Sequence, residues 1–229
     1  GQKCTAIRRI IIPKGMETAV IEALKDRLSK TLIGDPRDEN VRMGPLINMA
    51  QKNAAHAGLE ELKSEADVVI GEEDANFAVE PTQGAFFAPH ILLCKDPMSS
   101  HKVHEIEVFG PVATILPYET AEQAFEIAAM GGGSLACSVF SGDDDFSHQA
   151  VLRLAPFHGR VLIVNEEIGK GHSGHGVVMP QCIHGGPGRA GGGEEMGGLR
   201  GLYFYHRRSA IQASATRVQQ LLDQGLSLS

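Results

Sequence analysis

Several features that define whole classes of protein are absent from this sequence. No apolar run approaches the roughly 18 to 20 residues that a membrane-spanning helix needs, and no secretory signal is visible. The net charge of -7 is the opposite of the basic excess that general nucleic-acid binding requires. We therefore expect a cytoplasmic protein that binds neither membranes nor nucleic acids.

Cysteine is scarce as well. The four cysteines are Cys4, Cys94, Cys137 and Cys182, and no two of them form a Cys-x-x-Cys pair. Four cysteines are enough for two disulfides, but so few in 229 residues are more typical of free thiols in a reducing cytoplasm. An initiator methionine is missing too, because the chain opens on Gly-Gln-Lys-Cys-Thr. We expect a piece of a longer protein.

What is present is an alternation of strand-like and helix-like segments. Apolar runs rich in β-branched residues predict strands at residues 7–13, 66–71, 134–141 and 160–165, with further apolar runs at 85–94 and 112–116. Apolar residues at helical spacing predict helices at residues 15–32, 45–65, 121–130, 144–154 and 216–222. This alternation predicts an α/β domain with a largely parallel sheet.

Two segments interrupt the alternation. Residues 171–198 are rich in glycine and long for a loop, and loops of this kind are usually functional or mobile. Residues 202–212 then resume a strand-like run whose arginine and histidine side chains suit a sheet edge or a position between subunits.

Cys4 is the first candidate for chemistry. A cysteine attacks carbon as its thiolate, and Lys3, Arg8 and Arg9 supply positive charge nearby in the sequence that would favour this form. A lone cysteine is more often a small buried residue. Cys4 by itself therefore leaves both interpretations open.

The residues around Cys4, and a second segment about a hundred residues later, resemble the motifs of a known family. GQKCTA at residues 1–6, before a strand ending in Pro13, resembles the Gly-Gln-x-Cys-x-Ala signature of the aldehyde dehydrogenase superfamily. EVFGPV at residues 107–112 resembles the Glu-x-Phe-Gly-Pro-Val motif that this family places about a hundred residues after its cysteine. Further landmarks follow in the family's order at residues 34–36, 43–47 and 159–165, so that the resemblance spans nearly the whole chain.

The resemblance implies a role for each motif residue. Cys4 would be the nucleophile that forms a thioester with an aldehyde, and NAD or NADP would be the cofactor. Glu107 would bond the nicotinamide-ribose hydroxyls and Phe109 would pack beside the nicotinamide, both presented by the turn at Gly110 and Pro111. If the motif around Cys4 were absent, the simplest interpretation of Glu107 would be a solvated carboxylate, and that of Phe109 a ring in the core.

The resemblance also implies the architecture. Residues 1–199 would form a three-layer αβα catalytic domain, in which Asn165 holds the active-site loop by hydrogen bonds. Residues 200–229 would form an arm that adds an oligomerisation strand to a neighbouring subunit of a homodimer or tetramer. The water-activating glutamate, the oxyanion asparagine and the cofactor-binding domain would lie upstream of Cys4, so we expect the 229 residues alone not to turn over an aldehyde.

The glycine-rich segment departs from the common form of the family. HGGPGRAGGGEE at residues 184–195 and GHG at 174–176 resemble a branch that contains the ring-opening enzymes of aerobic phenylacetate and benzoate degradation, which oxidise semialdehydes carried as coenzyme A thioesters. His184, Gly185 and Gly186 are therefore candidates for the substrate mouth. A dinucleotide fingerprint needs a helix after its glycines, whereas a strand-like run follows these, which argues against such a fingerprint.

Alternatives to this assignment remain. The histidine pairs 101/104 and 172/175 lack a convincing third ligand, and we predict no metal site. A rival enzyme is an acylating dehydrogenase, which passes the acyl group of the thioester to coenzyme A. The upstream water-activating glutamate would distinguish a hydrolysing enzyme from this rival. A rival of another class is a non-catalytic domain in which Cys4 is idle, and alkylation of Cys4 at neutral pH separates it from an enzyme.

Overall fold

A computed structural model of the chain describes residues 1–177, 183–194, 198–207 and 209–224. Residues 1–177 and 183–194 form one compact unit, and residues 198–207 and 209–224 belong to a second. Within these ranges, no helix combines the length and the apolar character that crossing a bilayer requires.

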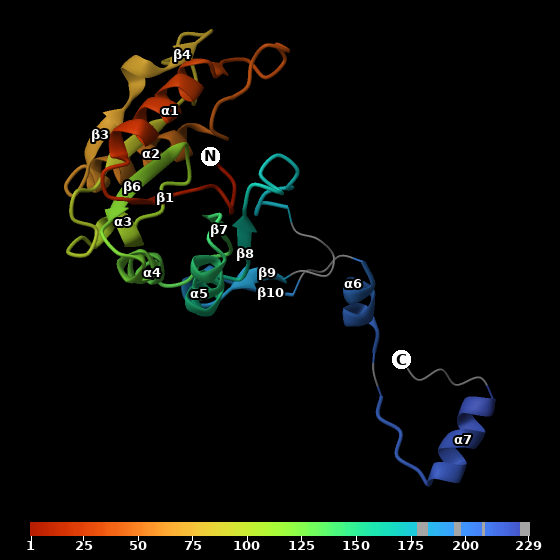
Figure 1. Cartoon of the computed structure of the whole chain (residues 1–229). Coiled ribbons are helices and arrows are strands. Elements are labelled where there is room, and N and C mark those ends of the chain that lie inside the picture. The colour runs from red at the N-terminus through yellow and green to blue at the C-terminus, as the bar shows by residue number, and fades with distance from the viewer. Residues whose placement is uncertain (178–182, 195–197, 208, 225–229) are drawn as a thin grey trace. The chain divides into compact units, whose positions relative to one another are not determined.

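A four-stranded sheet organises the first unit, with its strands in the order β1, β6, β5, β3. Figure 1 labels β1, β6 and β3 of this sheet. β1 (Arg9–Pro13), β6 (Val112–Tyr118) and β5 (His90–Leu93) run parallel, whereas β3 (Asp67–Ile70) is antiparallel to β5. Five consecutive residues of β6, from 112 to 116, are buried. Such unbroken apolar runs are typical of parallel strands because helices cover both of their faces.

Helices pack on opposite faces of this sheet. The apolar face of α1 (Glu17–Ser29) packs in one cluster with Ile115, and Leu59 of α2 (Met49–Leu62) packs in another with Leu116. Successive residues of a strand point to opposite faces, so the two helices lie on different sides of the sheet. The unit therefore has the three layers and the largely parallel sheet that the sequence predicts.

Side-chain caps fix where several helices begin. Asn48 before α2, Thr120 before α4 (Ala121–Ala129) and Asp143 before α5 (Asp144–Leu154) each accept a hydrogen bond from the backbone N–H three residues later. These bonds satisfy N–H groups that the first turn of a helix leaves unpaired. The helices predicted at these positions are confirmed.

A second pair of parallel strands, β7 (Cys137–Phe140) and β8 (Val161–Val164), packs against α4 and α5. β9 (Ile183–Gly186) and β10 (Gly191–Glu194) then form an antiparallel hairpin within the segment predicted to be a long loop. Shorter elements are β2 (Leu32–Ile33), β4 (Asn76–Phe77), α3 (Lys102–Glu105) and the 3-10 turns Glu72–Asp74, Ala155–Phe157 and Gly188–Ala190.

The strand predicted for residues 202–212 is wrong for this structure at residues 202–205, which are helical, whereas the oligomerisation strand that would pair with a neighbouring subunit stays a prediction. The second unit instead contains α6 (Gly198–Tyr205), and α7 (Ala215–Asp223) follows where a short helix is predicted. A strand needs the backbone groups of a neighbouring strand, whereas a helix pairs its own N–H and C=O groups, which a single chain can do locally. The domain boundary predicted between residues 199 and 200 stays a prediction.

Candidate functional site

A tight turn presents Cys4 just before β1. The backbone N–H of Ala6 donates to the carbonyl oxygen of Lys3 at 2.9 Å, which closes a four-residue turn with Cys4 and Thr5 at its centre. Cys4 is exposed, whereas Thr5 is only 9% exposed. The turn therefore buries one of its central residues and leaves the thiol accessible.

Segments far apart in the sequence meet at the start of this turn. A Cβ atom on Gly1 would lie 2.3 Å from the carbonyl carbon and oxygen of Gly110 and 2.4 Å from the nitrogen of Pro111, so a glycine is needed for this contact. The side-chain oxygen of Gln2 accepts a hydrogen bond from the backbone N–H of Ile47 at 2.8 Å. The segments that resemble family motifs are thus brought together around residue 1.

A cavity of about 720 Å³ lies beside the turn. Its walls include Cys4, Glu107 and Phe109, together with strands β1 and β7. Glu107 is exposed, and Phe109 is 42% exposed. Small-molecule sites usually enclose roughly 300 to 1,000 Å³. The structure therefore places the predicted nucleophile and both predicted nicotinamide contacts on a cavity of suitable size.

Positive charge gathers beside Glu107. Nε of Arg8 lies 4.0 Å from Oε1 of Glu107, and Arg189 lines the same cavity and donates to the backbone oxygen of Glu105 at 2.7 Å. Burial lowers the pKa of Arg8, and the negative charge of Glu107 acts in the opposite direction. Glu107 therefore lines the cavity together with two positively charged side chains, and its carboxylate can accept hydrogen bonds from ligand hydroxyls.

The charge of Arg9, which the sequence places near the candidate thiol, is engaged elsewhere. Its guanidinium donates to the carbonyl oxygens of Ile127 at 2.8 Å and Ala128 at 2.9 Å, at the end of α4, and its Nη1 lies 3.2 Å from Nδ1 of His104. Because arginine only donates, Nδ1 accepts, and Nε2–H of His104 donates to the oxygen of Pro97 at 2.8 Å. Burial lowers the pKa of Arg9 to about 10, helped by neighbouring arginine charges. Arg9 thus caps the C-terminal end of α4 by donating to carbonyl oxygens of its last turn.

The other cysteines differ from Cys4 in their surroundings. Cys94 is buried, with its Sγ 3.2 Å from Oγ of Ser100, and burial raises the pKa of its thiol. Cys137 also lines the cavity, and burial raises its pKa to about 12. Cys182 lies outside the described residues. Among the cysteines within the described ranges, Cys4 is the exposed one.

Asn165 lies directly after β8. Its Oδ1 accepts a hydrogen bond from the backbone N–H of Ile168 at 3.3 Å, which stabilises its own loop. As far as the structure describes the chain, Asn165 is not among the residues that line the cavity. Its predicted role in holding the active-site loop stays a prediction.

His184, Gly185 and Gly186 belong to β9, which packs closely on its neighbours. A Cβ atom on Gly159 would lie 1.7 Å from the carbonyl oxygen of Gly185, and one on Gly186 would lie 2.3 Å from the carbonyl oxygen of Ser134. Nδ1 of His184 is buried without a hydrogen-bond partner in the described part of the chain. Of the described residues that line the cavity, none is in β9, and the place of these three at the substrate mouth stays a prediction.

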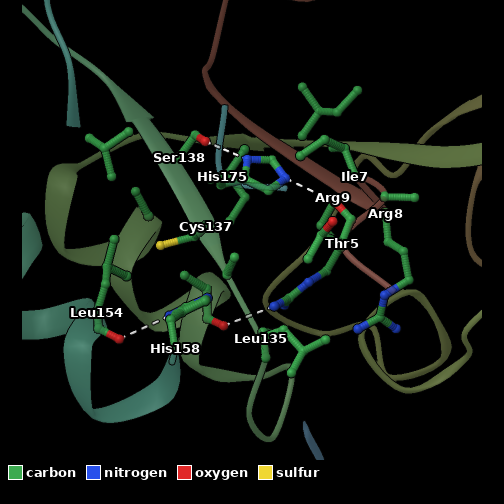
Figure 2. A pocket seen from close by; sticks show the side chains of 18 of the residues that line it. Thr5, Ile7, Arg8, Arg9, Leu135, Cys137, Ser138, Leu154, His158 and His175 are labelled. Atoms are coloured by element: carbon green, nitrogen blue, oxygen red, sulfur yellow. Dashed lines mark hydrogen bonds between the residues drawn. The ribbon is translucent and has the colours of Figure 1, made fainter. Parts of the chain in front are cut away.

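His175 lines the cavity, which sequence reasoning missed. Its Nδ1 lies 2.6 Å from Oγ of Ser138, and its Nε2 lies 2.9 Å from the backbone oxygen of Thr5 (Figure 2). In the sequence, His175 stands out only within the GHG segment at residues 174–176 and as half of a metal pair with His172, and neither feature predicts its place on the cavity. Across the described ranges, no three histidine, cysteine or acidic side chains are arranged to hold a metal ion.

Comparisons with known proteins extend this picture. The profile of the aldehyde dehydrogenase family matches residues 1–211. The chain is 46% identical over 193 residues to a 3,4-dehydroadipyl-CoA semialdehyde dehydrogenase of Aromatoleum evansii, covering 82% of this chain and 37% of the relative. It is 42% identical over 176 residues to Protein MaoC of Klebsiella aerogenes, covering 76% of this chain and 51% of the relative.

A solved structure is also similar. A betaine aldehyde dehydrogenase from Staphylococcus aureus in complex with NAD+ matches with a TM-score of 0.71 and 29% identity, over 89% of this chain and 38% of that one. The motif resemblance and the α/β fold of that family are thereby confirmed. The chain spans between 37% and 51% of the length of the curated relatives that it matches.

Proposed function

Because this chain belongs to the aldehyde dehydrogenase family, we propose that it supplies the nucleophile and part of the nicotinamide site of a longer enzyme that oxidises an aldehyde to an acid. The observation that carries the proposal is one cavity of about 720 Å³ lined by Cys4, Glu107 and Phe109. These residues are all exposed, and Cys4 is separated from Glu107 and Phe109 by more than a hundred positions in the sequence.

In the proposed mechanism, the thiolate of Cys4 adds to the carbonyl carbon, and the electron pair of the C=O π bond moves to the oxygen. The backbone N–H of Cys4, in the turn, donates a hydrogen bond to this oxygen. When bound, NAD or NADP provides the acceptor for a hydride. Loss of that hydride from the carbon leaves a thioester on Cys4. Water then cleaves the thioester to the acid and the free thiol, with its general base expected upstream of Cys4.

Glu107 and Phe109 fit the nicotinamide half of a dinucleotide. An exposed carboxylate accepts hydrogen bonds from ribose hydroxyls, and an exposed aromatic ring packs on a planar heterocycle. The solved relative that contains NAD+ supports a nicotinamide cofactor for this chain as well. The adenosine half would be bound by the upstream domain, which is where a preference for NAD or NADP would arise.

For the substrate, we propose a semialdehyde carried as a coenzyme A thioester, formed during the degradation of an aromatic compound. Support comes from the 46% identity to a dehydrogenase named for such a semialdehyde and from the segments at residues 174–176 and 184–195. The test is to compare kcat/KM for a coenzyme A semialdehyde with that for a free aldehyde of the same chain length. A preference for the free aldehyde would contradict this substrate.

The catalytic proposal is tested in the longer protein that carries this chain. Cys4→Ala should abolish aldehyde oxidation and leave NAD(P) binding intact, whereas Glu107→Gln should weaken NAD(P) binding because it removes the charged acceptor. Cofactor binding is measured by fluorescence titration, and turnover by absorbance of the reduced cofactor. Turnover that persists in Cys4→Ala would contradict the proposal.

The 229 residues alone should not oxidise an aldehyde, because the general base and most of the cofactor site are expected upstream. An assay of this polypeptide with NADP and several aldehydes checks the expectation. Turnover that Cys4→Ala abolishes would overturn it. A homodimer or tetramer of the longer protein is likewise a proposal, which light scattering tests.

A further inference from the structure

A chain of hydrogen bonds ties β7 to the turn that presents Cys4 (Figure 2). Ser138 on β7 lies 2.6 Å from Nδ1 of His175, whose Nε2 lies 2.9 Å from the backbone oxygen of Thr5. We propose that His175 is a positioning residue, which holds the turn in the shape that presents Cys4 to the cavity, and that Ser138 orients its ring. The inference rests on the proposed role of Cys4 as the nucleophile.

In the series of hydrogen bonds from Ser138 through His175 to Thr5, each polar atom acts either as donor or as acceptor. The carbonyl oxygen of Thr5 can only accept, so Nε2 of His175 carries a hydrogen and donates it. In the neutral ring Nδ1 then has a free lone pair, which accepts the hydroxyl hydrogen of Ser138. The carbonyl oxygen of Thr5 thus fixes the tautomer, and the bond to Ser138 orients the ring toward Thr5. Both ring nitrogens are engaged, which leaves no lone pair for a metal.

The bond from His175 reaches the peptide unit that closes the turn. The N–H of the peptide between Thr5 and Ala6 donates to the oxygen of Lys3 at 2.9 Å, and the C=O of the same peptide accepts from His175. A peptide that donates on one side and accepts on the other is polarised, so each bond strengthens the other. Losing the bond to His175 would free this peptide to rotate and would displace the backbone of Cys4.

Packing of the same segment supports this inference independently of the hydrogen bonds. A Cβ atom on Gly176 would lie 2.9 Å from Nζ of Lys3 and 3.0 Å from Oγ1 of Thr5, the two neighbours of Cys4 in the chain. One residue later, the backbone oxygen of Val177 accepts a hydrogen bond from Nη1 of Arg160 at 2.9 Å. Residues 174–177 are therefore held between the start of β8 and the turn.

The test uses two replacements of His175 in the longer protein that carries this chain. His175→Gln keeps an N–H near the position of Nε2 and can still donate to Thr5. His175→Asn keeps a polar group near the position of Nδ1, facing Ser138, but is too short to reach Thr5. The readouts are kcat, the KM of the aldehyde, and the alkylation rate of Cys4 followed on its own peptide by mass spectrometry.

We expect His175→Asn to lower kcat by roughly 10- to 100-fold, because a displacement of about 1 Å at a reacting group can cost about 100-fold. The alkylation rate of Cys4 should change with it, while the KM and the dissociation constant of NAD(P) stay close to wild type. His175→Gln should recover most of both rates. If Asn and Gln variants behave alike in both rates, the ring only fills space and the inference is wrong.

Ser138 gives a second test that leaves His175 in place. Ser138→Ala removes the hydroxyl that orients the ring of His175 and should reduce the alkylation rate of Cys4, whereas Ser138→Thr keeps the hydroxyl and should restore it. Equal rates in these two variants would overturn the role of Ser138. The alkylation rate is measured without turnover, so the positioning role can fail or hold separately from the proposed oxidation, which Cys4→Ala tests.

Discussion

Replacing Gly159 with alanine would show how firmly the β9–β10 hairpin is seated. Gly159 begins residues 159–165, one of the segments that resemble landmarks of the family. A Cβ atom there would lie 1.7 Å from the oxygen and 2.7 Å from the carbonyl carbon of Gly185, and 3.0 Å from the oxygen of Leu135. These are all backbone atoms, so no side-chain rotation can relieve the overlap.

The size of the disturbance follows from these distances. Cβ contacts below 3.0 Å are essentially not observed, so Gly185 would have to retreat by at least 1.3 Å, the difference between 3.0 Å and 1.7 Å. Gly159 itself is held by a hydrogen bond from its N–H to the oxygen of Ser134 at 3.0 Å, so β9 is the part that must move. Overpacking costs about 1 to 3 kcal/mol, and a clash confined to backbone belongs near 3 kcal/mol.

Urea unfolding measures the loss in free energy, and hydrogen exchange measured on the β9 peptide shows whether the hairpin is released locally. Gly142→Ala is the matched control, because nothing lies within 4 Å of a Cβ at that position. It should change the free energy of unfolding by less than about 0.5 kcal/mol. If Gly159→Ala resembled Gly142→Ala in both measurements, the close packing of β9 on Gly159 would be refuted.

Three further predictions concern groups that are wholly or partly buried. Burial lowers the pKa of both His104 and His158 below the ordinary 6.5, so in acid the unfolded chain binds more protons than the folded chain. The free energy of unfolding should therefore decrease as the pH falls below about 6.5, which thermal melts at decreasing pH check. If His104→Gln left the dependence of stability on pH unchanged, that would speak against this account. The raised pKa of Cys137, about 12, should keep it unalkylated at neutral pH, and peptide-resolved labelling of the folded protein that modified Cys137 as fast as the exposed thiol would disprove its burial. Arg9→Met removes donors to two carbonyls and should cost about 3 kcal/mol in urea unfolding, whereas the exposed Arg27→Met should be nearly neutral, and equal losses would contradict the account of Arg9.

Much of the fold could be predicted because its signals are local. The strands of the central sheet are apolar runs, and the caps at Thr120 and Asp143 are visible in the sequence. β2 and β4 have two residues each and leave no periodicity to detect. Residues 202–205 are rich in aromatic side chains that favour strands, yet a helix satisfies their backbone without a neighbouring strand.

The candidate site could likewise be predicted only where its signals are local in the sequence. Cys4, Glu107 and Phe109 could be found because each lies in a short motif, and the structure brings them to one cavity. The role of His175 could not be predicted, because its partner Thr5 is 170 positions away and hydrogen bonds over that distance leave no pattern in the sequence. Contacts of this kind depend on the packing of whole elements.

Strands β1 and β7 share a property that bears on how this protein is handled. In the part of the chain that the structure describes, β1 pairs with β6 alone and β7 with β8 alone, and both strands line the cavity. An open strand edge offers a row of N–H and C=O groups to any extended peptide that reaches it, including a second copy of the same chain. Edge-to-edge pairing at β1 or β7 therefore offers the 229-residue polypeptide a route to oligomers or precipitates that does not depend on a native subunit interface.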